Sequence, residues 1–149
     1  MKIFMVLILI LLSFSNVQAQ DQMDFDYKIQ SEAFGTERQF YVHLPERYYR
    51  NDLDSFGILF VLDAQSDTYY NNASGITDYL VNNYQIFPLI VVGVHSENRG
   101  SEFIPLDRSL DPGDSDNYGQ AEMLREHISQ EIWPVVQENF RVNEFKAIV

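Results

Sequence analysis

The sequence predicts an α/β fold, in which a largely parallel sheet is covered by helices and begins with an antiparallel hairpin. Residues 58–62 and 89–94 are uninterrupted apolar runs, and such runs are typical of parallel strands that are buried on both faces. A helical pattern in residues 73–84 separates them, and a strand–helix–strand succession forms a right-handed parallel unit. The chain has 149 residues, of which 46% are hydrophobic, so we expect one globular domain.

The first residues predict export and do not belong to this domain. A basic residue precedes an apolar run at 3–12, and Val17 and Ala19 are the small residues that a signal peptidase reads. We therefore expect a signal peptide at 1–19, cleaved after Ala19, and an α/β domain at 20–149. The apolar run is shorter than the roughly 20 residues that span a bilayer, and no cysteine is present to carry a lipid. The protein should be secreted or periplasmic, with no stable membrane anchor after cleavage.

The chain is acidic, with a formal net charge of −12 at pH 7. Binding to nucleic acid requires clustered Lys and Arg side chains that neutralise phosphates, and the sequence contains no such cluster. Nucleic acid is therefore not an expected partner, and the acidity favours solubility.

An antiparallel hairpin is expected at the start of the domain, after a loose acidic leader at 21–26. Its strands are residues 27–34 and 38–44, and Gly35 between them can adopt the positive φ that a tight turn requires. The second strand alternates, so one set of side chains faces the core and the other faces water. The core-facing set is Phe40, Val42 and Leu44, and the water-facing set is Gln39, Tyr41 and His43.

Apolar residues that recur every three or four positions predict two amphipathic helices. The first, residues 73–84, should bury Ile76, Tyr79, Leu80 and Tyr84. The second, residues 120–140, contains Pro134, which removes a backbone hydrogen bond and should kink the helix. Its buried face should consist of Leu124, Ile128, Ile132, Val135, Val136 and Phe140. Residues 145–149 then predict a third apolar strand.

No metal site is expected. Residues 100–119 predict an irregular insertion with four aspartates, and three of them, Asp111, Asp114 and Asp116, have spacings that suggest a calcium loop. They lack the glycine and the terminal glutamate of a calcium loop, so a solvated turn is favoured. The chain has no cysteine, and its three histidines are far apart in the sequence, at His43, His95 and His127. A zinc site is therefore improbable, and His43 and His127 are interpreted as surface or packing residues.

Polar segments follow both central strands, beginning at Asp63 and at His95. The carboxyl ends of parallel strands meet at one edge of a sheet, where open α/β proteins handle ligands. The chain contains no Gly-x-Ser-x-Gly nucleophile motif, no phosphate-binding loop and no Gly-x-Gly-x-x-Gly motif, which are the short signatures of nucleophile and cofactor sites. The residues themselves therefore leave the function open between an enzyme and a binding module, and no cofactor is expected.

The order and spacing of several stretches of the sequence are informative. They are Gly35-Thr36-Glu37-Arg38, residues 40–45 and 58–63, residues 90–94 with the later Arg99, and residues 128–140 around Glu131-Ile132-Trp133-Pro134. Together they resemble the exported esterases of the α/β-hydrolase fold, a group that includes the esterase D type, the siderophore and feruloyl esterases and the mycolyltransferases. The resemblance covers residues 27–149 and corresponds to the N-terminal half of that fold.

The resemblance implies a serine esterase that hydrolyses a small-molecule carboxylic ester without a cofactor. It implies that the backbone N–H of Gln65 is one oxyanion-hole donor, with Asp63, Ala64 and Arg99 in the substrate-binding region. Ala64 stands where the family has glycine. The family's nucleophile elbow, with its serine, and the acid and histidine would all follow Val149, so no catalytic residue is expected within this chain. The alternatives are a non-catalytic exported module that binds a ligand or partner with the same loops and a periplasmic binding domain of unrelated α/β topology.

Overall fold

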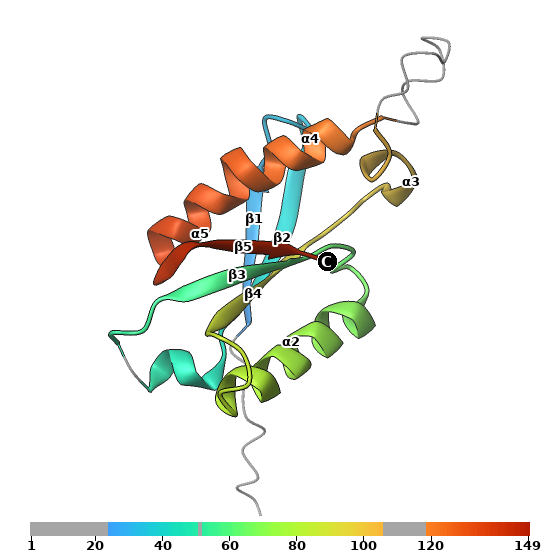
Figure 1. The fold of residues 1–149 in the computed structure, drawn as a ribbon. Helices are drawn as coiled ribbons and strands as arrows, with labels where there is room; N and C mark the ends of the chain where they lie inside the picture. Colours follow the sequence, from blue (N-terminus) through green and yellow to red (C-terminus); the bar gives the residue numbers. More distant parts are fainter. Residues whose placement is uncertain (1–23, 51, 106–118) are drawn as a thin grey trace, which may run out of the picture.

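The computed structural model describes residues 24–50, 52–105 and 119–149. Within them, five strands form one sheet in the order β1-β2-β4-β3-β5 (Figure 1). The strands are β1 (Asp24–Gln30), β2 (Glu37–His43), β3 (Phe56–Val61), β4 (Leu89–Val94) and β5 (Val142–Ile148). The helical elements are η1 (Glu46–Tyr49), α2 (Asp67–Asn82), α3 (Arg99–Glu102), α4 (Ala121–Glu126), η3 (His127–Ile132) and α5 (Trp133–Asn139).

The expected N-terminal hairpin is confirmed. β1 and β2 pair in antiparallel register, and Gly35 in the turn has a φ of 69°. The prediction of a loose leader at 21–26 is wrong for residues 24–26, which belong to β1. Asp24 lies opposite His43 and its carboxylate bonds the His43 ring at 2.7 Å, so a polar contact extends the strand beyond its apolar residues.

The parallel unit expected around the central strand is also confirmed. β3 is parallel to β4 on one side and to β5 on the other, while β2 joins β4 in antiparallel register. The side chains of β3 and β4 fill the core, which includes Phe56, Ile58, Ile90 and Val92. β5 lies at the edge of the sheet (Figure 1).

Helix α2 covers one face of the sheet (Figure 1). The side of the helix that packs against the sheet differs from the side that the sequence predicts. Of the side chains expected inside, Ile76, Tyr79 and Tyr84 are 60%, 61% and 77% exposed. The helix begins at Asp67 and buries Tyr70, Ser74, Thr77 and Val81 instead. The reason lies at Gly93 of β4, where a Cβ atom would come within 2.6 Å of the Tyr70 ring. Because the ring of Tyr70 occupies the space above Gly93, the helix is rotated and its more apolar side faces out.

The long C-terminal helix covers the opposite face of the sheet (Figure 1). Leu124, Ile132 and Val136 of its expected apolar face are buried in the main core. The disturbance expected at Pro134 takes the form of a π-helical segment, η3, directly before α5. Pro134 is the second residue of α5 and follows η3 without a break in the helix, so its missing N–H removes one intrahelical hydrogen bond at the junction of the two segments.

Two predictions fall on residues outside the described ranges, namely the signal peptide at 1–19 and the aspartates at 111–116. Among the residues that are described, no helix is long and apolar enough to cross a membrane.

Candidate functional site

The two loops that follow β3 and β4 lie side by side at the carboxyl edge of the sheet. Val61 pairs with Gly93 near the ends of the two strands, and the Ala64 N–H donates a hydrogen bond to the carbonyl of Val94 at 3.1 Å. The Arg99 Nε lies 3.3 Å from Asp63 Oδ2. The structure thus brings together Asp63, Ala64, Gln65 and Arg99.

Asp63 carries the backbone strain of the first loop. Its φ is 59°, a left-handed conformation that aspartate tolerates better than most residues. Its carbonyl accepts the N–H of Ser66 at 2.9 Å, so the chain turns sharply from β3 towards α2. Its side chain is mostly buried and bonds Gln65 Nε2 at 3.1 Å and Arg99 Nε. The carboxylate therefore holds the turn in place.

Ala64 fits its position without strain. Among the described non-glycine residues only Asp63 and Tyr84 have positive φ, so Ala64 does not need the conformational freedom of glycine. Its side chain is buried, with its Cβ 2.8 Å from where a Cβ on Gly93 would lie. The alanine that replaces the family's glycine is thus accommodated because β4 has glycine beside it.

The side chain of Gln65 is hydrogen-bonded to neighbouring residues, whereas its backbone N–H bonds none of the residues that the structure describes. Its Oε1 accepts the N–H of Ser96 at 2.9 Å, and its Nε2 donates to Asp63 Oδ1. Its own N–H donates to no acceptor among residues 24–50, 52–105 and 119–149. The residue is exposed. A rigid loop therefore presents a backbone donor that the fold itself does not use.

A buried carboxylate, Glu102, organises the second loop and was missed in the sequence. It is 1% exposed and accepts hydrogen bonds from Arg38 Nη2 and Ser96 Oγ, both at 2.8 Å, and from the N–H groups of Asn98 at 3.1 Å and Glu97 at 3.3 Å. Burial alone would raise the pKa of Glu102, but the hydrogen bonds from Arg38 and Ser96 hold it below its usual value. The sequence did contain one sign of a buried ion pair. Arg38 lies on the same, core-facing side of its strand as Phe40 and Val42, so its guanidinium would need a buried partner.

His43 lies away from these loops, whereas His127 is close enough to Arg38 and Glu102 for their charges to act on it. The prediction that His43 faces water is wrong, since it is 2% exposed. Its ring nitrogens lie 2.7 Å from Asp24 and 2.9 Å from Asp78 of α2, because α2 covers that face of the sheet. His127 is buried in the long helix, with its Nδ1 2.5 Å from Glu131 Oε2, and is a packing residue as expected.

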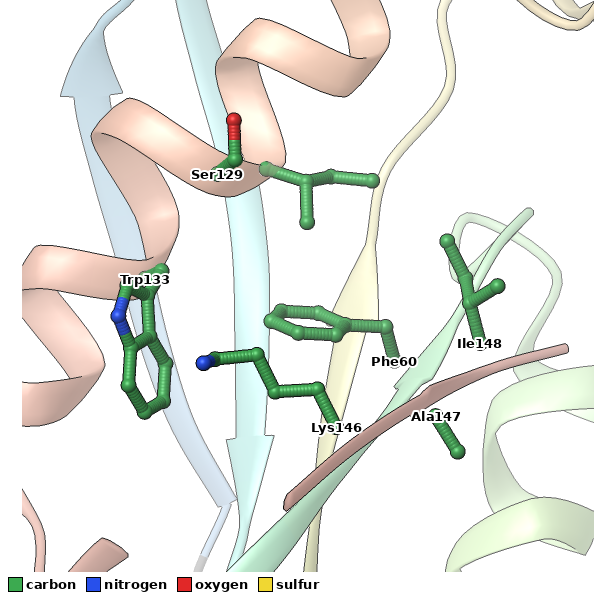
Figure 2. A pocket seen from close by; sticks show the side chains of 7 residues that line it. Phe60, Ser129, Trp133, Lys146, Ala147 and Ile148 are labelled. Atoms are coloured by element: carbon green, nitrogen blue, oxygen red, sulfur yellow. The ribbon is translucent and has the colours of Figure 1, made fainter. Parts of the chain in front are cut away.

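Two apolar cavities adjoin this edge of the sheet. One, of about 340 Å³, is lined by Leu62, Phe103, Leu124, Ile128 and Ile148. The other, of about 450 Å³, lies between the long helix and β5 (Figure 2). In Figure 2 the Lys146 amine points towards the Trp133 ring, 3.8 Å from its centroid. Among the described residues, no group of three or more His, Cys, Asp or Glu side chains could hold a metal ion.

The architecture, a mixed sheet in the order β1-β2-β4-β3-β5 with helices on both faces, is that of an α/β-hydrolase-like fold. The family model described as "Putative esterase" matches residues 31–149. The chain therefore belongs to this esterase family. A comparison with curated protein sequences finds no significant match.

Solved structures support the fold assignment. An IroE-like serine hydrolase from Shewanella oneidensis is 20% identical with a TM-score of 0.72, over 84% of this chain and 41% of that protein. Siderophore hydrolase EstA from Aspergillus nidulans is 15% identical with a TM-score of 0.72, over 91% and 51%. A ferulic acid esterase from Anaeromyces mucronatus is 16% identical with a TM-score of 0.59, over 84% and 47%. The chain therefore spans about half or less of the proteins that it resembles.

Proposed function

We propose that this chain is the N-terminal part of an exported serine esterase and that the backbone N–H of Gln65 is one of its oxyanion-hole donors. The observation that carries the proposal is the uncommitted N–H of Gln65 on a loop that other contacts hold rigid. Ester hydrolysis passes through a tetrahedral intermediate with a negatively charged oxygen, and preorganised N–H groups stabilise that charge. The left-handed conformation of Asp63 supports the proposal, since it forms the tight turn that contains Gln65.

The position of β5 supports a nucleophile that lies beyond Val149. β5 runs parallel to β3, and the Leu62 N–H donates to the carbonyl of Val149 at 2.9 Å. A residue a few positions further would therefore lie next to the Asp63–Gln65 turn. A serine there would attack the ester carbonyl with histidine as general base, the alcohol would leave, and water would hydrolyse the acyl-enzyme. The chain itself contains no Gly-x-Ser-x-Gly motif.

A small-molecule carboxylic ester is the proposed substrate class. The apolar cavity of about 340 Å³ beside Leu62 and Phe103 suits the acyl or alcohol part of such an ester, and the Arg99 guanidinium lies 5.6 Å from the Phe103 ring that lines it. Two similar structures are a siderophore hydrolase and a ferulic acid esterase, and the second of these names agrees with a carboxylic-ester substrate.

The decisive test removes the proposed donor. The reading frame is followed past the codon for Val149, the encoded protein is expressed, and turnover of p-nitrophenyl acetate is measured. We expect a Gly-x-Ser-x-Gly motif within a few residues, and we expect Gln65→Pro, which has no N–H, to lower kcat by about 10²–10³-fold. Gln65→Ala is the matched control, because it loses the same side-chain contacts but keeps the N–H, and it should retain clearly more activity than Gln65→Pro. Circular dichroism checks that both variants fold.

Two results would overturn the proposal. A stop codon directly after Val149, with no ester turnover by the chain, would leave a non-catalytic module that binds a ligand or partner with the same loops. Equal activity of Gln65→Pro and Gln65→Ala would remove the assigned role of the amide. Export is tested separately by mass spectrometry of the secreted protein, whose mature chain should begin at Gln20 if the signal peptide is cleaved after Ala19.

A further inference from the structure

The carboxylate of Glu102 is connected to the Gln65 loop by one intermediate residue. Ser96 donates its hydroxyl to Glu102 Oε2 at 2.8 Å and its backbone N–H to Gln65 Oε1 at 2.9 Å. Ser96 is itself buried; its contact with Glu102 is buried, and its contact with the exposed Gln65 is partly buried. The path from Glu102 to Gln65 therefore consists of two direct hydrogen bonds.

A second path returns from Gln65 to Glu102, so the contacts form a closed ring. Gln65 Nε2 bonds Asp63 Oδ1 at 3.1 Å, and the other oxygen of Asp63 lies 3.3 Å from Arg99 Nε. Arg99 and Glu102 are the first and last residues of α3, which follows β4 (Figure 1). The exposed Arg99 side chain is the weakest link of this ring, so the path through Ser96 is the stronger of the two connections.

The ring is anchored to the sheet at Glu102. Arg38 of β2 donates to its Oε1 at 2.8 Å, and the Arg38 guanidinium stacks on the Phe34 ring at 4.1 Å. The same oxygen of Glu102 accepts two backbone N–H groups of the second loop, those of Glu97 and Asn98. The Glu102 carboxylate is therefore held in place, because moving it away from these partners would leave a buried charge unpaired, which is energetically costly.

We infer that Glu102 is a positioning residue, which sets the orientation of the Gln65 backbone N–H through Ser96. The inference rests on the proposed function of that N–H. Glu102 is one of the residues that line the cavity of about 340 Å³, but its two carboxylate oxygens accept hydrogen bonds from Arg38, Ser96, Glu97 and Asn98, so we assign it to positioning the loops. Three of these donors belong to the second loop, and their bonds fix the conformation of that loop. The Gln65 side chain, bonded to Ser96, ties the first loop to the second.

The test measures the Gln65 amide directly, by ¹H–¹⁵N NMR and amide hydrogen exchange on the whole chain. In Glu102→Gln we expect the backbone and side-chain amide resonances of Gln65 and Ser96 to shift. Exchange at Glu97 and Asn98 should rise by about tenfold or more, the factor expected when a hydrogen bond to a charged group is weakened. Glu102→Asp keeps the charge and should restore part of the wild-type shifts.

Two controls separate positioning from stability. Glu97→Gln removes the other carboxylate next to Arg38, which lies 3.6 Å away and is 55% exposed, and it should leave Gln65 unchanged. Val136→Ala weakens the core far from the loops and should lower the melting temperature without shifting Gln65. If the Gln65 resonances in Glu102→Gln stay at their wild-type positions, or move as much in Val136→Ala, the inference is wrong.

The outcome is independent of ester turnover. If the longer protein hydrolyses no ester, the proposed function fails, while the NMR result still decides whether Glu102 orients the loop. If it does hydrolyse esters, Glu102→Gln should lower kcat and leave KM close to the wild-type value, because a misplaced oxyanion donor weakens only the transition state.

Discussion

Strand β2 carries two buried charged residues that differ in almost every other respect. Arg38 lies near its start and faces the long C-terminal helix, on the side of Phe40 and Val42. His43 lies at its end and faces α2, where Asp78 contacts it. Both are nearly inaccessible to solvent, at 3% and 2% exposure.

The two residues have different partners. Arg38 pairs with Glu102, and although burial acts to raise the pKa of that carboxyl, the hydrogen bonds from Arg38 and Ser96 hold it below its usual value. His43 lies between Asp24 and Asp78; burial acts to lower its pKa, but the hydrogen bonds and charges of the two aspartates raise it to about 9. The carboxylate next to the candidate site is therefore ionised at neutral pH, whereas the cluster that joins β1, β2 and α2 depends on a proton that is lost above neutral pH.

The first prediction concerns the buried ion pair of Arg38 and Glu102. Arg38→Met leaves the Glu102 carboxylate buried without its cation, and breaking a buried ion pair in this way costs about 3–5 kcal/mol. Urea unfolding at pH 7 measures the loss. Because replacing both ions by apolar side chains is often close to neutral, adding Glu102→Leu should recover part of it. A loss below about 1 kcal/mol in the single variant would mean that water reaches the pair.

The second prediction uses the proton on His43. The pKa of about 9 in the folded protein lies above the value of about 6.5 in an unfolded chain. The stabilisation is therefore complete below about pH 6.5 and is lost as the pH rises through 9, and it amounts to about 3 kcal/mol. Urea unfolding between pH 6 and pH 10 measures this loss.

Two variants show whether His43 causes the pH dependence. His43→Gln should flatten the profile between pH 6.5 and pH 10. His127→Gln should leave it unchanged, because burial lowers the pKa of His127 below its usual value and the residue is neutral throughout this range. A flat wild-type profile would show that His43 is not protonated in the folded protein.

These two clusters also mark where sequence reasoning ends. The strands of the core were predictable because residues 58–62 and 89–94 are apolar without interruption, and parallel strands bury both faces. Arg38 and Glu102 are 64 positions apart, and no local period connects them. His43 was placed in water because alternation distinguishes the two sides of a strand but does not show that a helix covers the second side.

The third prediction concerns the contact that determines the rotation of α2. Gly93→Ala would place a Cβ atom 2.6 Å from the Tyr70 ring and 2.8 Å from the Cβ of Ala64, and overpacking of this kind costs about 1–3 kcal/mol. Gly75 in α2 is the matched control, because a Cβ atom there meets nothing within 4 Å. Gly75→Ala should stabilise the protein by up to about 1 kcal/mol. If both variants have the same melting temperature, Tyr70 does not fix the helix.

This contact explains why the buried face of α2 was not predictable. The apolar pattern of Ile76, Tyr79 and Tyr84 is a good helical stripe, yet the choice between two faces depended on one aromatic ring and a glycine in another element. The Gln65 amide was likewise invisible to patterns of hydrophobicity, since a backbone N–H has no side-chain signature. Its role as an oxyanion-hole donor was suggested by the family resemblance. Only the structure shows that this N–H has no acceptor among the described residues.

The smallest effect is predicted for Arg99, whose side chain is the most exposed charged group in the ring of contacts between the two loops. Its side chain is 68% exposed and pairs with Asp63 at 3.3 Å, and exposed ion pairs contribute about 0–1 kcal/mol. Arg99→Ala should therefore change the free energy of unfolding by less than about 1 kcal/mol in urea. Arg47, whose pair with Asp54 is shorter at 2.9 Å and whose side chain is 22% exposed, provides the comparison, and Arg47→Ala should cost more. If Arg99→Ala is the more destabilising of the two, Arg99 is chiefly a structural anchor of the Asp63 turn; if it is nearly neutral, its guanidinium is free to meet a substrate at the edge of the site.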